Sequence, residues 1–268
     1  MSTNAGSSTV AEWDAATYHR ISNPHMTWGA RILARLPLRG DETVVDAGCG
    51  SGRLTAELLD RLPRGHVIAV DRSANMLAAA RANLAQRYGD RVTFIQGDLA
   101  ALALAGVGDA IFSGATFHWV PDHPRLFAAL YRTLKPGGRL VAQCGGAGNL
   151  AHLVARADAL MADPRFAPSF ADWPGPWQFA GAATTADRLR AAGFRDVATD
   201  LEAAPVYLAD AAAYREFLAK VIFGEHLARL PDEHRRAAFV ETLTDAAAGD
   251  TPPFALDYVR LNMQATRP

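Results

Sequence analysis

The sequence predicts an α/β protein with a doubly wound, mostly parallel, seven-stranded sheet and a small helical cap. Short runs of β-forming residues alternate with amphipathic helical segments between about residues 43 and 145. A glycine-rich turn follows the first run directly, as at the ligand-binding edge of an open parallel sheet. After residue 146 the pattern is less regular and predicts a loop with added helices.

The first five strands are expected at 43–48, 66–71, 92–97, 109–114 and 139–146. Two connecting helices are predicted by apolar residues at helical spacing. These residues are Leu54, Leu58, Leu62, Leu77, Ala80 and Leu84. Each strand is thus followed by a crossover, as a parallel sheet requires.

A third helix is expected to begin near Pro124, which suits a first helical turn, and to end at the KPGG of 135–138. Its apolar face would contain Phe127, Leu130, Tyr131 and Leu134. The proline- and aromatic-rich stretch 163–181 predicts a loop or lid between two helices. The remaining expected elements are a strand at 194–201, helices at 214–222 and 235–247, and a last strand at 254–265.

Composition excludes several classes of partner. The net charge is −1, and Lys and Arg are scattered singly, so we expect neither nucleic acid nor an anionic membrane as a partner. No apolar run approaches the roughly 20 residues of a membrane span, and the polar residues 1–10 read as a tail, not a signal peptide. Two distant cysteines, Cys49 and Cys144, suggest no disulfide and no metal site. A cytoplasmic location is the expectation.

The glycines of VVDAGCGSGRLT, residues 44–55, indicate a ligand that approaches bare backbone. A dinucleotide fingerprint would need a glycine at Arg53, and a phosphate-binding Walker loop would need a Gly-Lys pair that is absent here. Asp71 ends the second strand about 20 residues further on, where an acid can accept hydrogen bonds from ribose hydroxyls. These facts favour an adenosine-bearing ligand without a pyrophosphate.

Together with VIAVDRSANML, VTFIQGDL and LKPGGRL, the glycine stretch resembles the ordered motifs of the class I S-adenosylmethionine-dependent methyltransferases over about residues 40–145. The resemblance implies that S-adenosylmethionine is bound and S-adenosylhomocysteine released, with no metal. It also implies three parts: N-terminal tail and cap helices at 1–40, a cofactor-binding core at 41–146, and a C-terminal part with lid and helical insertion at 147–268.

The resemblance implies a set of cofactor-binding residues. Asp46 and the three glycines would lie against the methionine part, Asp71 would hold the ribose, and Asp98 with Leu99 would meet the adenine. The full set of cofactor-binding candidates is Tyr18, Asp46, Gly48, Gly50, Gly52, Asp71, Arg72, Met76, Asp98, Leu99 and Ser113. Taken singly, each residue suits a structural role equally well: Asp71 as a helix cap, Met76 as a core residue and Asp98 as a turn residue. Their joint spacing favours binding of the cofactor.

The acceptor is expected beyond the fourth strand, in SGATFHWVPDHP at 113–124. That stretch is similar to the trans-aconitate methyltransferase-like group of small-molecule enzymes. His118 is the candidate catalytic base, with a structural hydrogen-bonding role as the alternative. The candidates for the substrate pocket are His25, Phe117, Trp119, Trp173 and Trp177, although each aromatic residue also suits a core. Arg20, Arg165 and Arg260 are conceivable partners for an acidic substrate.

We therefore expect an enzyme that transfers a methyl group to a small-molecule acceptor, with a carboxylate oxygen favoured. The alternatives are a hydroxyl, nitrogen or carbon acceptor in a natural product, a nicotinamide-dependent oxidoreductase, and a non-catalytic binding protein. Arg53 in place of the third dinucleotide glycine argues against the oxidoreductase. The sequence leaves the oligomeric state open.

Overall fold

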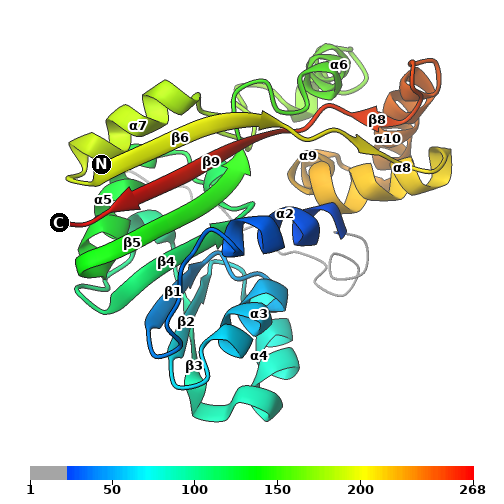
Figure 1. The fold of residues 1–268 in the computed structure, drawn as a ribbon. Helices are drawn as coiled ribbons and strands as arrows, with labels where there is room; N and C mark the ends of the chain where they lie inside the picture. The colour runs from blue at the N-terminus through cyan, green and yellow to red at the C-terminus, as the bar shows by residue number, and fades with distance from the viewer. Residues whose placement is uncertain (1–22) are drawn as a thin grey trace, which may run out of the picture.

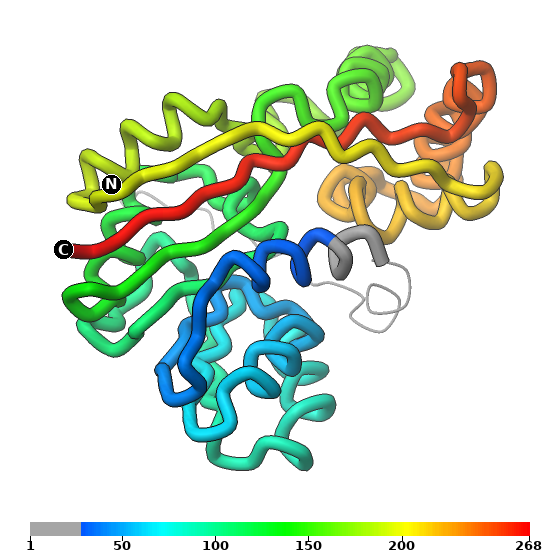
Figure 2. Tube along the Cα trace, in the orientation of Figure 1, coloured from blue at the N-terminus to red at the C-terminus, as the bar shows by residue number. Residues whose placement is uncertain are grey.

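The computed structural model describes the backbone of residues 23–268 and the side chains of residues 28–268. Its main feature is a seven-stranded sheet in the order β3-β2-β1-β4-β5-β9-β6. The strands are β1 (Thr43–Ala47), β2 (His66–Asp71), β3 (Val92–Gln96), β4 (Gly108–Gly114), β5 (Leu134–Gly145), β6 (Arg195–Ala203) and β9 (Val259–Thr266). Only β9 is antiparallel to its neighbours, between β5 and β6 (Figure 2). The predicted fold class is confirmed.

Successive residues of the strands pack on opposite faces of the sheet. Val44 belongs to a core cluster with residues of α2, α3 and α4, whereas Val45 packs with residues of α5 and α7. These helices are α2 (Asn23–Leu33), α3 (Arg53–Arg61), α4 (Ala74–Tyr88), α5 (His123–Thr133) and α7 (Ala182–Ala191). Because both faces are covered (Figure 1), the strands can be apolar on both sides, as their sequences are.

Two helix starts follow from their caps. The hydroxyl of Ser73 accepts a hydrogen bond from the amide of Met76, and the carboxylate of Asp122 accepts one from the amide of Arg125. The predicted start of α5 near Pro124 is confirmed. The predicted end was slightly wrong: Leu134 and 135–138 belong to β5, because the amide of Gly137 bonds to Arg267 beside the sheet.

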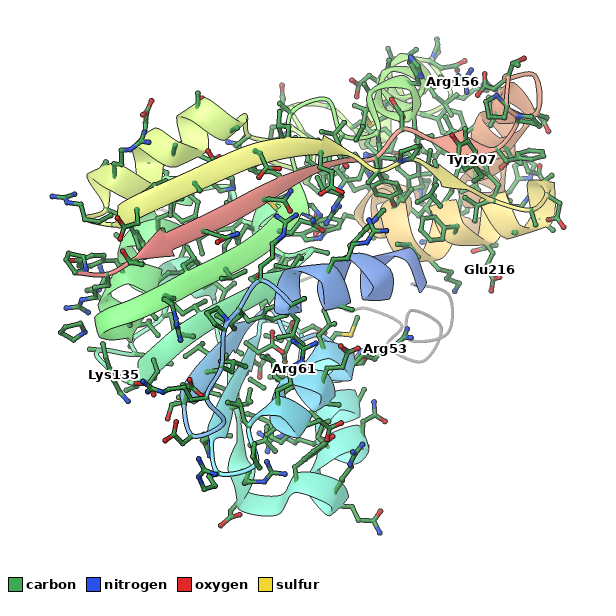
Figure 3. All side chains as sticks on the ribbon, in the orientation of Figure 1. Arg53, Arg61, Lys135, Arg156, Tyr207 and Glu216 are labelled. Atoms are coloured by element: carbon green, nitrogen blue, oxygen red, sulfur yellow. The ribbon has the colours of Figure 1, made fainter. Side chains whose placement is uncertain are left out.

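A helical cap follows the carboxyl ends of β5 and β6 (Figure 1). Its elements are α6 (Ala151–Met161), α8 (Ala211–Phe217), α9 (Gly224–Arg229), α10 (Glu233–Ala248) and the short strand pair β7 (Val206–Tyr207) and β8 (Ala255–Leu256). The cap has its own apolar cluster, which includes Phe166, Tyr214 and Phe239. Arg156, labelled in Figure 3, joins α6 to Asp250 through two hydrogen bonds of 2.7 and 2.6 Å. The domain boundaries given above remain predictions.

Two predicted elements of the cap are interrupted. The helix expected at 214–222 is α8 followed by a π-helical turn, Leu218–Ile222, closed by the amide of Phe223 on the carbonyl of Leu218. The strand expected at 254–265 is broken because the carbonyl of Asp257 accepts a hydrogen bond from Leu150, just before α6, instead of pairing in the sheet.

The stretch 163–181 is irregular apart from a short 3₁₀ turn, Ala167–Ser169, which confirms the loop between two helices. Its action as a lid remains a prediction. Within the part of the chain that the structure describes, no helix is both long and apolar enough to span a membrane.

Candidate functional site

The glycine loop between β1 and α3 exposes backbone to an open space. Gly48 has φ +88°, and a Cβ atom placed on it would lie 2.1 Å from Oγ1 of Thr116, so no other residue fits there. Gly50 has φ +53°, and a Cβ atom on it would meet nothing within 4 Å. Thr116 therefore packs beneath the first glycine, while the second faces an opening.

Asp71, the last residue of β2, ties this loop to the next helix. Its Oδ2 accepts a hydrogen bond from the amide of Gly50 and its Oδ1 one from the amide of Ser73, both at 2.9 Å. Burial raises the pKa of this carboxyl above its ordinary value. A carboxylate offers about four lone-pair sites, so two remain for the hydroxyl groups of a ligand.

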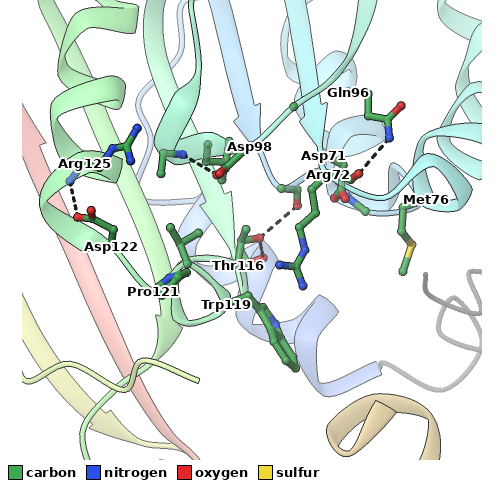
Figure 4. A pocket seen from close by; sticks show the side chains of 18 residues that line it. Asp71, Arg72, Met76, Gln96, Asp98, Thr116, Trp119, Pro121, Asp122 and Arg125 are labelled. Atoms are coloured by element: carbon green, nitrogen blue, oxygen red, sulfur yellow. Dashed lines mark hydrogen bonds between the residues drawn. The ribbon is translucent and has the colours of Figure 1, made fainter. Parts of the chain in front are cut away.

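Asp71 and the glycines line a cavity of about 590 Å³ at the carboxyl ends of β1, β2, β3 and β4 (Figure 4). Asp98 enters it after β3, held because its Oδ1 accepts a hydrogen bond from the amide of Ala100 at 2.9 Å. The predicted residues that the structure brings together here are Gly48, Gly50, Asp71, Arg72, Met76, Asp98, Leu99 and Trp119. The volume lies in the range of pockets for small ligands.

Ten further lining residues were not named individually as candidates, although those at 114–116 and 120–122 lie in the stretch 113–124 predicted for the acceptor. They are Gln96, Gly97, Ala100, Gly114, Ala115, Thr116, Val120, Pro121, Asp122 and Arg125. Gln96 is the last residue of β3 and Thr116 follows the end of β4, positions that could have identified them. Arg125 reaches the cavity from the first turn of α5, beside the cap residue Asp122 (Figure 4).

Three predicted cofactor residues lie outside the lining and support the loop instead. The carboxyl of Asp46 accepts a hydrogen bond of 2.6 Å from Thr55 Oγ1, and complete burial raises its pKa to about 7. Ser113 Oγ donates to the carbonyl of Ala47 at 2.6 Å. Gly52 precedes α3 with φ +84° and lies against Leu84. Direct contact of these three residues with a cofactor stays a prediction.

His118 lies in a second, smaller cavity of about 40 Å³ that shares Ala115 and Trp119 with the first. The amide of Gly145 donates a hydrogen bond of 3.1 Å to Nδ1 of this histidine. Nδ1 therefore carries no hydrogen, and the neutral ring carries its hydrogen on Nε2. This hydrogen bond fits the structural role that is the alternative for His118, and the role of general base stays a prediction.

The other substrate-pocket candidates fall in different places. Trp119 lines both cavities, and Trp177 lines the smaller one. Phe117 is buried in the main core beside Phe127, and Trp173 packs edge-to-face on His226 in the cap, so neither lines the two cavities described above. Tyr18 lies outside the described residues, as does the side chain of His25.

Two further kinds of chemistry find no support in the described residues. Burial, and to a lesser extent the negative charges of Asp46 and Asp71, raises the pKa of the Cys49 thiol well above its ordinary value. The thiol is therefore a poor nucleophile. No group of three or more His, Cys, Asp or Glu side chains is placed to hold a metal ion within residues 28–268.

Comparison with known sequences agrees with this geometry. A methyltransferase domain model matches residues 44–138. A trans-aconitate 2-methyltransferase of Methylobacterium radiotolerans is 33% identical over 260 residues, 91% of this chain and 92% of its own length. One of Azoarcus sp. is 43% identical over 131 residues, 49% of this chain, so this chain aligns with only half, 50%, of that relative.

Solved structures share the fold. A phosphoethanolamine N-methyltransferase 2 of Haemonchus contortus, in complex with S-adenosylhomocysteine, superposes with a TM-score of 0.62 at 18% identity, over 95% of this chain and 57% of that one. The YcgJ protein of Bacillus subtilis superposes with a TM-score of 0.61 at 19% identity, over 91% of this chain and 98% of that one. On the full-length sequence relationship and the shared fold, the chain belongs to the class I S-adenosylmethionine-dependent methyltransferases.

Proposed function

We propose that this protein transfers a methyl group from S-adenosylmethionine to a carboxylate oxygen of a small-molecule acid. The observation that carries the proposal is the convergence of Gly50, Asp71 and Asp98 on one cavity of about 590 Å³. The trans-aconitate 2-methyltransferases to which the chain is similar support a carboxylate acceptor. Hydroxyl, nitrogen and carbon acceptors, a nicotinamide-dependent oxidoreductase and a non-catalytic protein are less favoured.

The residues of the larger cavity fit S-adenosylmethionine. The open side of Gly50 admits a ligand against the backbone, where any side chain would occupy the cavity. Asp71 retains acceptor sites for two ribose hydroxyls, and Asp98 can accept from an adenine amine. Met76 and Leu99 are buried apolar residues of the lining and suit the faces of a purine.

When bound, S-adenosylmethionine supplies a methyl group activated by a sulfonium. The acceptor oxygen forms a C–O bond as the C–S bond breaks, and the electron pair of the C–S bond stays on sulfur. The chain's task is to hold the acceptor in line and to keep water out. Trp119 suits both requirements because it forms the shared wall of the two cavities, and its aromatic face favours a nearby cation.

The geometry of His118 supports a carboxylate acceptor. A carboxylate is already ionised near neutral pH and transfers no proton on methylation, so it requires no general base. A phenol or an amine would require a base, and the hydrogen bond from Gly145 leaves His118 with its hydrogen on Nε2. We propose that the reaction takes place in the cytoplasm, where the free, buried Cys49 and Cys144 would stay reduced.

The first experiment measures binding of S-adenosylhomocysteine by isothermal titration. We expect the protein to bind it, and Asp71→Ala to weaken binding about 10- to 100-fold, since a hydrogen bond to a charged group is worth about 1.5–3 kcal/mol. Asp90→Ala, which removes an exposed acid before β3, is the matched control and should bind normally. Failure of the native protein to bind would refute the proposal.

The second experiment identifies the acceptor atom. The protein is incubated with labelled S-adenosylmethionine and a panel of carboxylic acids, phenols and amines, and products are identified by mass spectrometry. We expect a methyl ester that alkali hydrolyses. Formation of an alkali-stable ether, methylamine or C-methyl product instead would overturn the carboxylate assignment while keeping methyl transfer.

A further inference from the structure

We propose that His123 is a positioning residue for methyl transfer: its ring holds the turn Phe117–Trp119, and with it the cavity wall formed by Trp119, through the carbonyl of Phe117. The inference rests on the proposed methyl transfer and adds to it a residue that lines neither of the two cavities described above. His123 is the first residue of α5 and is 2% exposed. Its two ring nitrogens have partners on two different segments of the chain.

These partners fix the tautomer of His123. Nη1 of Arg188, on α7, lies 3.1 Å from Nδ1, and because a guanidinium only donates, Nδ1 accepts and carries no hydrogen. Nε2 lies 3.0 Å from the carbonyl oxygen of Phe117, which only accepts, so Nε2 carries the hydrogen and donates it. Burial, and to a lesser extent the charge of Arg188, lowers the pKa of His123 below its ordinary value. The ring is therefore neutral and is held between α7 and the turn.

The start of α5 does not require this ring. The carboxylate of Asp122 caps the helix by accepting a hydrogen bond of 3.0 Å from the amide of Arg125. The carbonyl of Phe117 also has a second donor, the amide of Val120 at 3.0 Å, so it would stay hydrogen-bonded without His123. Since neither group depends on His123 for a partner, the additional bond restrains the direction of the turn.

A second side chain of α5 supports the same turn. Phe127 lies four residues after His123 and therefore on the same face of the helix. Its ring packs edge-to-face on Phe117 with the ring centroids 6.1 Å apart, and its centroid lies 5.7 Å from that of His123. One face of α5 thus holds both the side chain and the carbonyl of Phe117.

The position of Trp119 depends on this turn. Its amide donates to the carbonyl of Thr116 at 2.9 Å, and the carbonyl of the preceding His118 accepts from the amide of Gln178 at 2.8 Å. The side chain of Trp119 lines both cavities. A shift of the carbonyl of Phe117 would therefore move the wall at which the methyl donor and the acceptor are expected to meet. A misplacement of about 1 Å at such a wall can cost about 100-fold in rate.

The test compares two replacements of His123. His123→Phe keeps an aromatic ring beside Phe127 but removes both hydrogen bonds, whereas His123→Gln keeps an amide donor for the carbonyl of Phe117. Methyl transfer is measured with labelled S-adenosylmethionine. The probe acid is trans-aconitate or, where another acid of the panel is methylated faster, that acid.

We expect His123→Phe to lower kcat at least about tenfold and to leave the Kd for S-adenosylhomocysteine within about threefold, because the acceptor side of the site is displaced. His123→Gln should restore kcat to within about threefold of the native value. The matched control is His66→Phe. It removes a ring that contacts Oγ1 of Thr93 at the end of β2 remote from Asp71, and it should keep the native kcat.

Arg188 supplies a second variant. Its side chain is half-buried, so Arg188→Met should fold, and it frees His123 to change its tautomer. We expect kcat to fall about threefold or more, with no further fall when the replacement is added to His123→Phe, because both variants break the same chain of contacts. Arg190→Met, an exposed arginine on α7, is the control. If His123→Phe does not fold, native kcat in Arg188→Met would overturn the proposal.

Fluorine NMR of protein labelled with fluorotryptophan reports the turn without turnover. The resonance of Trp119 is assigned by its loss in Trp119→Phe. We expect His123→Phe to shift this resonance and His123→Gln to leave it in place, while the resonance of Trp28 stays unchanged in both. Native kcat in His123→Phe, or an unmoved Trp119 resonance, would overturn the role of His123 while methyl transfer stands. A native protein that fails to bind S-adenosylhomocysteine would instead refute the proposed function itself.

Discussion

Nη2 of Arg72 lies 2.9 Å from Oε1 of Glu225 and joins the end of β2 to the first turn of α9. Arg72 lines the larger cavity, whereas Glu225 belongs to the cap. The two side chains are 39% and 24% exposed, so the ion pair is partly hydrated and contributes little to overall stability. The ion pair has another consequence. Because Arg72 lines the larger cavity, Glu225 of the cap holds a side chain of the cavity wall in position.

We expect Glu225→Gln to lower the free energy of unfolding by less than about 1 kcal/mol, as for partly exposed ion pairs. The affinity for S-adenosylhomocysteine should nevertheless fall severalfold, because Arg72 loses the partner that positions it. Urea unfolding and isothermal titration measure the two effects. Glu241→Gln, an exposed acid on α10, is the control. Equal affinities in both variants would show that the ion pair does not position the site.

Two glycines of the loop should respond differently to alanine. Gly50→Ala places a Cβ atom in open space at φ +53° and should cost about 1–2 kcal/mol of stability from backbone strain, together with a loss of cofactor affinity. Gly48→Ala should be far more destabilising because its Cβ atom collides with Thr116.

Gly106→Ala is the matched control for backbone strain: it has φ +61°, a Cβ atom there would meet nothing within 4 Å, and it lies outside the larger cavity. Chemical denaturation and titration with S-adenosylhomocysteine compare the three variants. If Gly50→Ala and Gly106→Ala lose the same stability and bind equally well, the open side of Gly50 does not face the ligand.

Asp46 should make stability fall as the pH rises through about 7. Burial raises its pKa to about 7, above the ordinary value of 3.8, so the folded protein binds a proton that the unfolded chain has released. The stabilisation is complete below about pH 3.8 and is lost as the pH rises through 7. Asp46→Asn, which cannot ionise, should show a flatter dependence of unfolding free energy between pH 5 and 8 (~3 pH units). An unchanged profile would contradict this.

His226 should have the opposite effect. Burial, and to a lesser extent the charge of Arg229, lowers its pKa to about 3, and its Nδ1 has no hydrogen-bond partner. In the unfolded chain the histidine takes up a proton near its ordinary pKa of 6.5, so the contribution of His226 to stability is lost as the pH falls from 6.5 toward 3. The slope is at most about 1.4 kcal/mol per pH unit.

We expect His226→Leu to be less sensitive to acid than the native protein and His234→Gln, an exposed histidine on α10, to match it. Because Asp46 acts in the opposite sense over part of the same range, the informative quantity is the difference between variant and native unfolding curves at each pH. A constant difference from pH 7 to pH 4 (~3 units) would rule out a buried neutral His226.

The strands and the glycine loop were predictable because each depends on consecutive residues. Asp71 and Asp98 were predictable for a related reason: parallel strands bring their carboxyl ends to one edge of the sheet. Trp173 and Trp177 illustrate the limit. They lie four residues apart in an irregular loop without periodicity, yet one packs in the cap and the other lines the smaller cavity.

The sequence alone therefore determined the sheet, the edge of the sheet at which the cofactor is expected and the class of ligand. Local apolar periodicity and the order of the strands determine which loops meet at that edge. Tertiary structure decided the rest. Only the insertion of β9 between β5 and β6 brings Arg260 near His118, and only the cap carries Glu225 to Arg72. Such pairs are separated by more than a hundred residues, and no local pattern specifies which distant side chain will fill the same small volume.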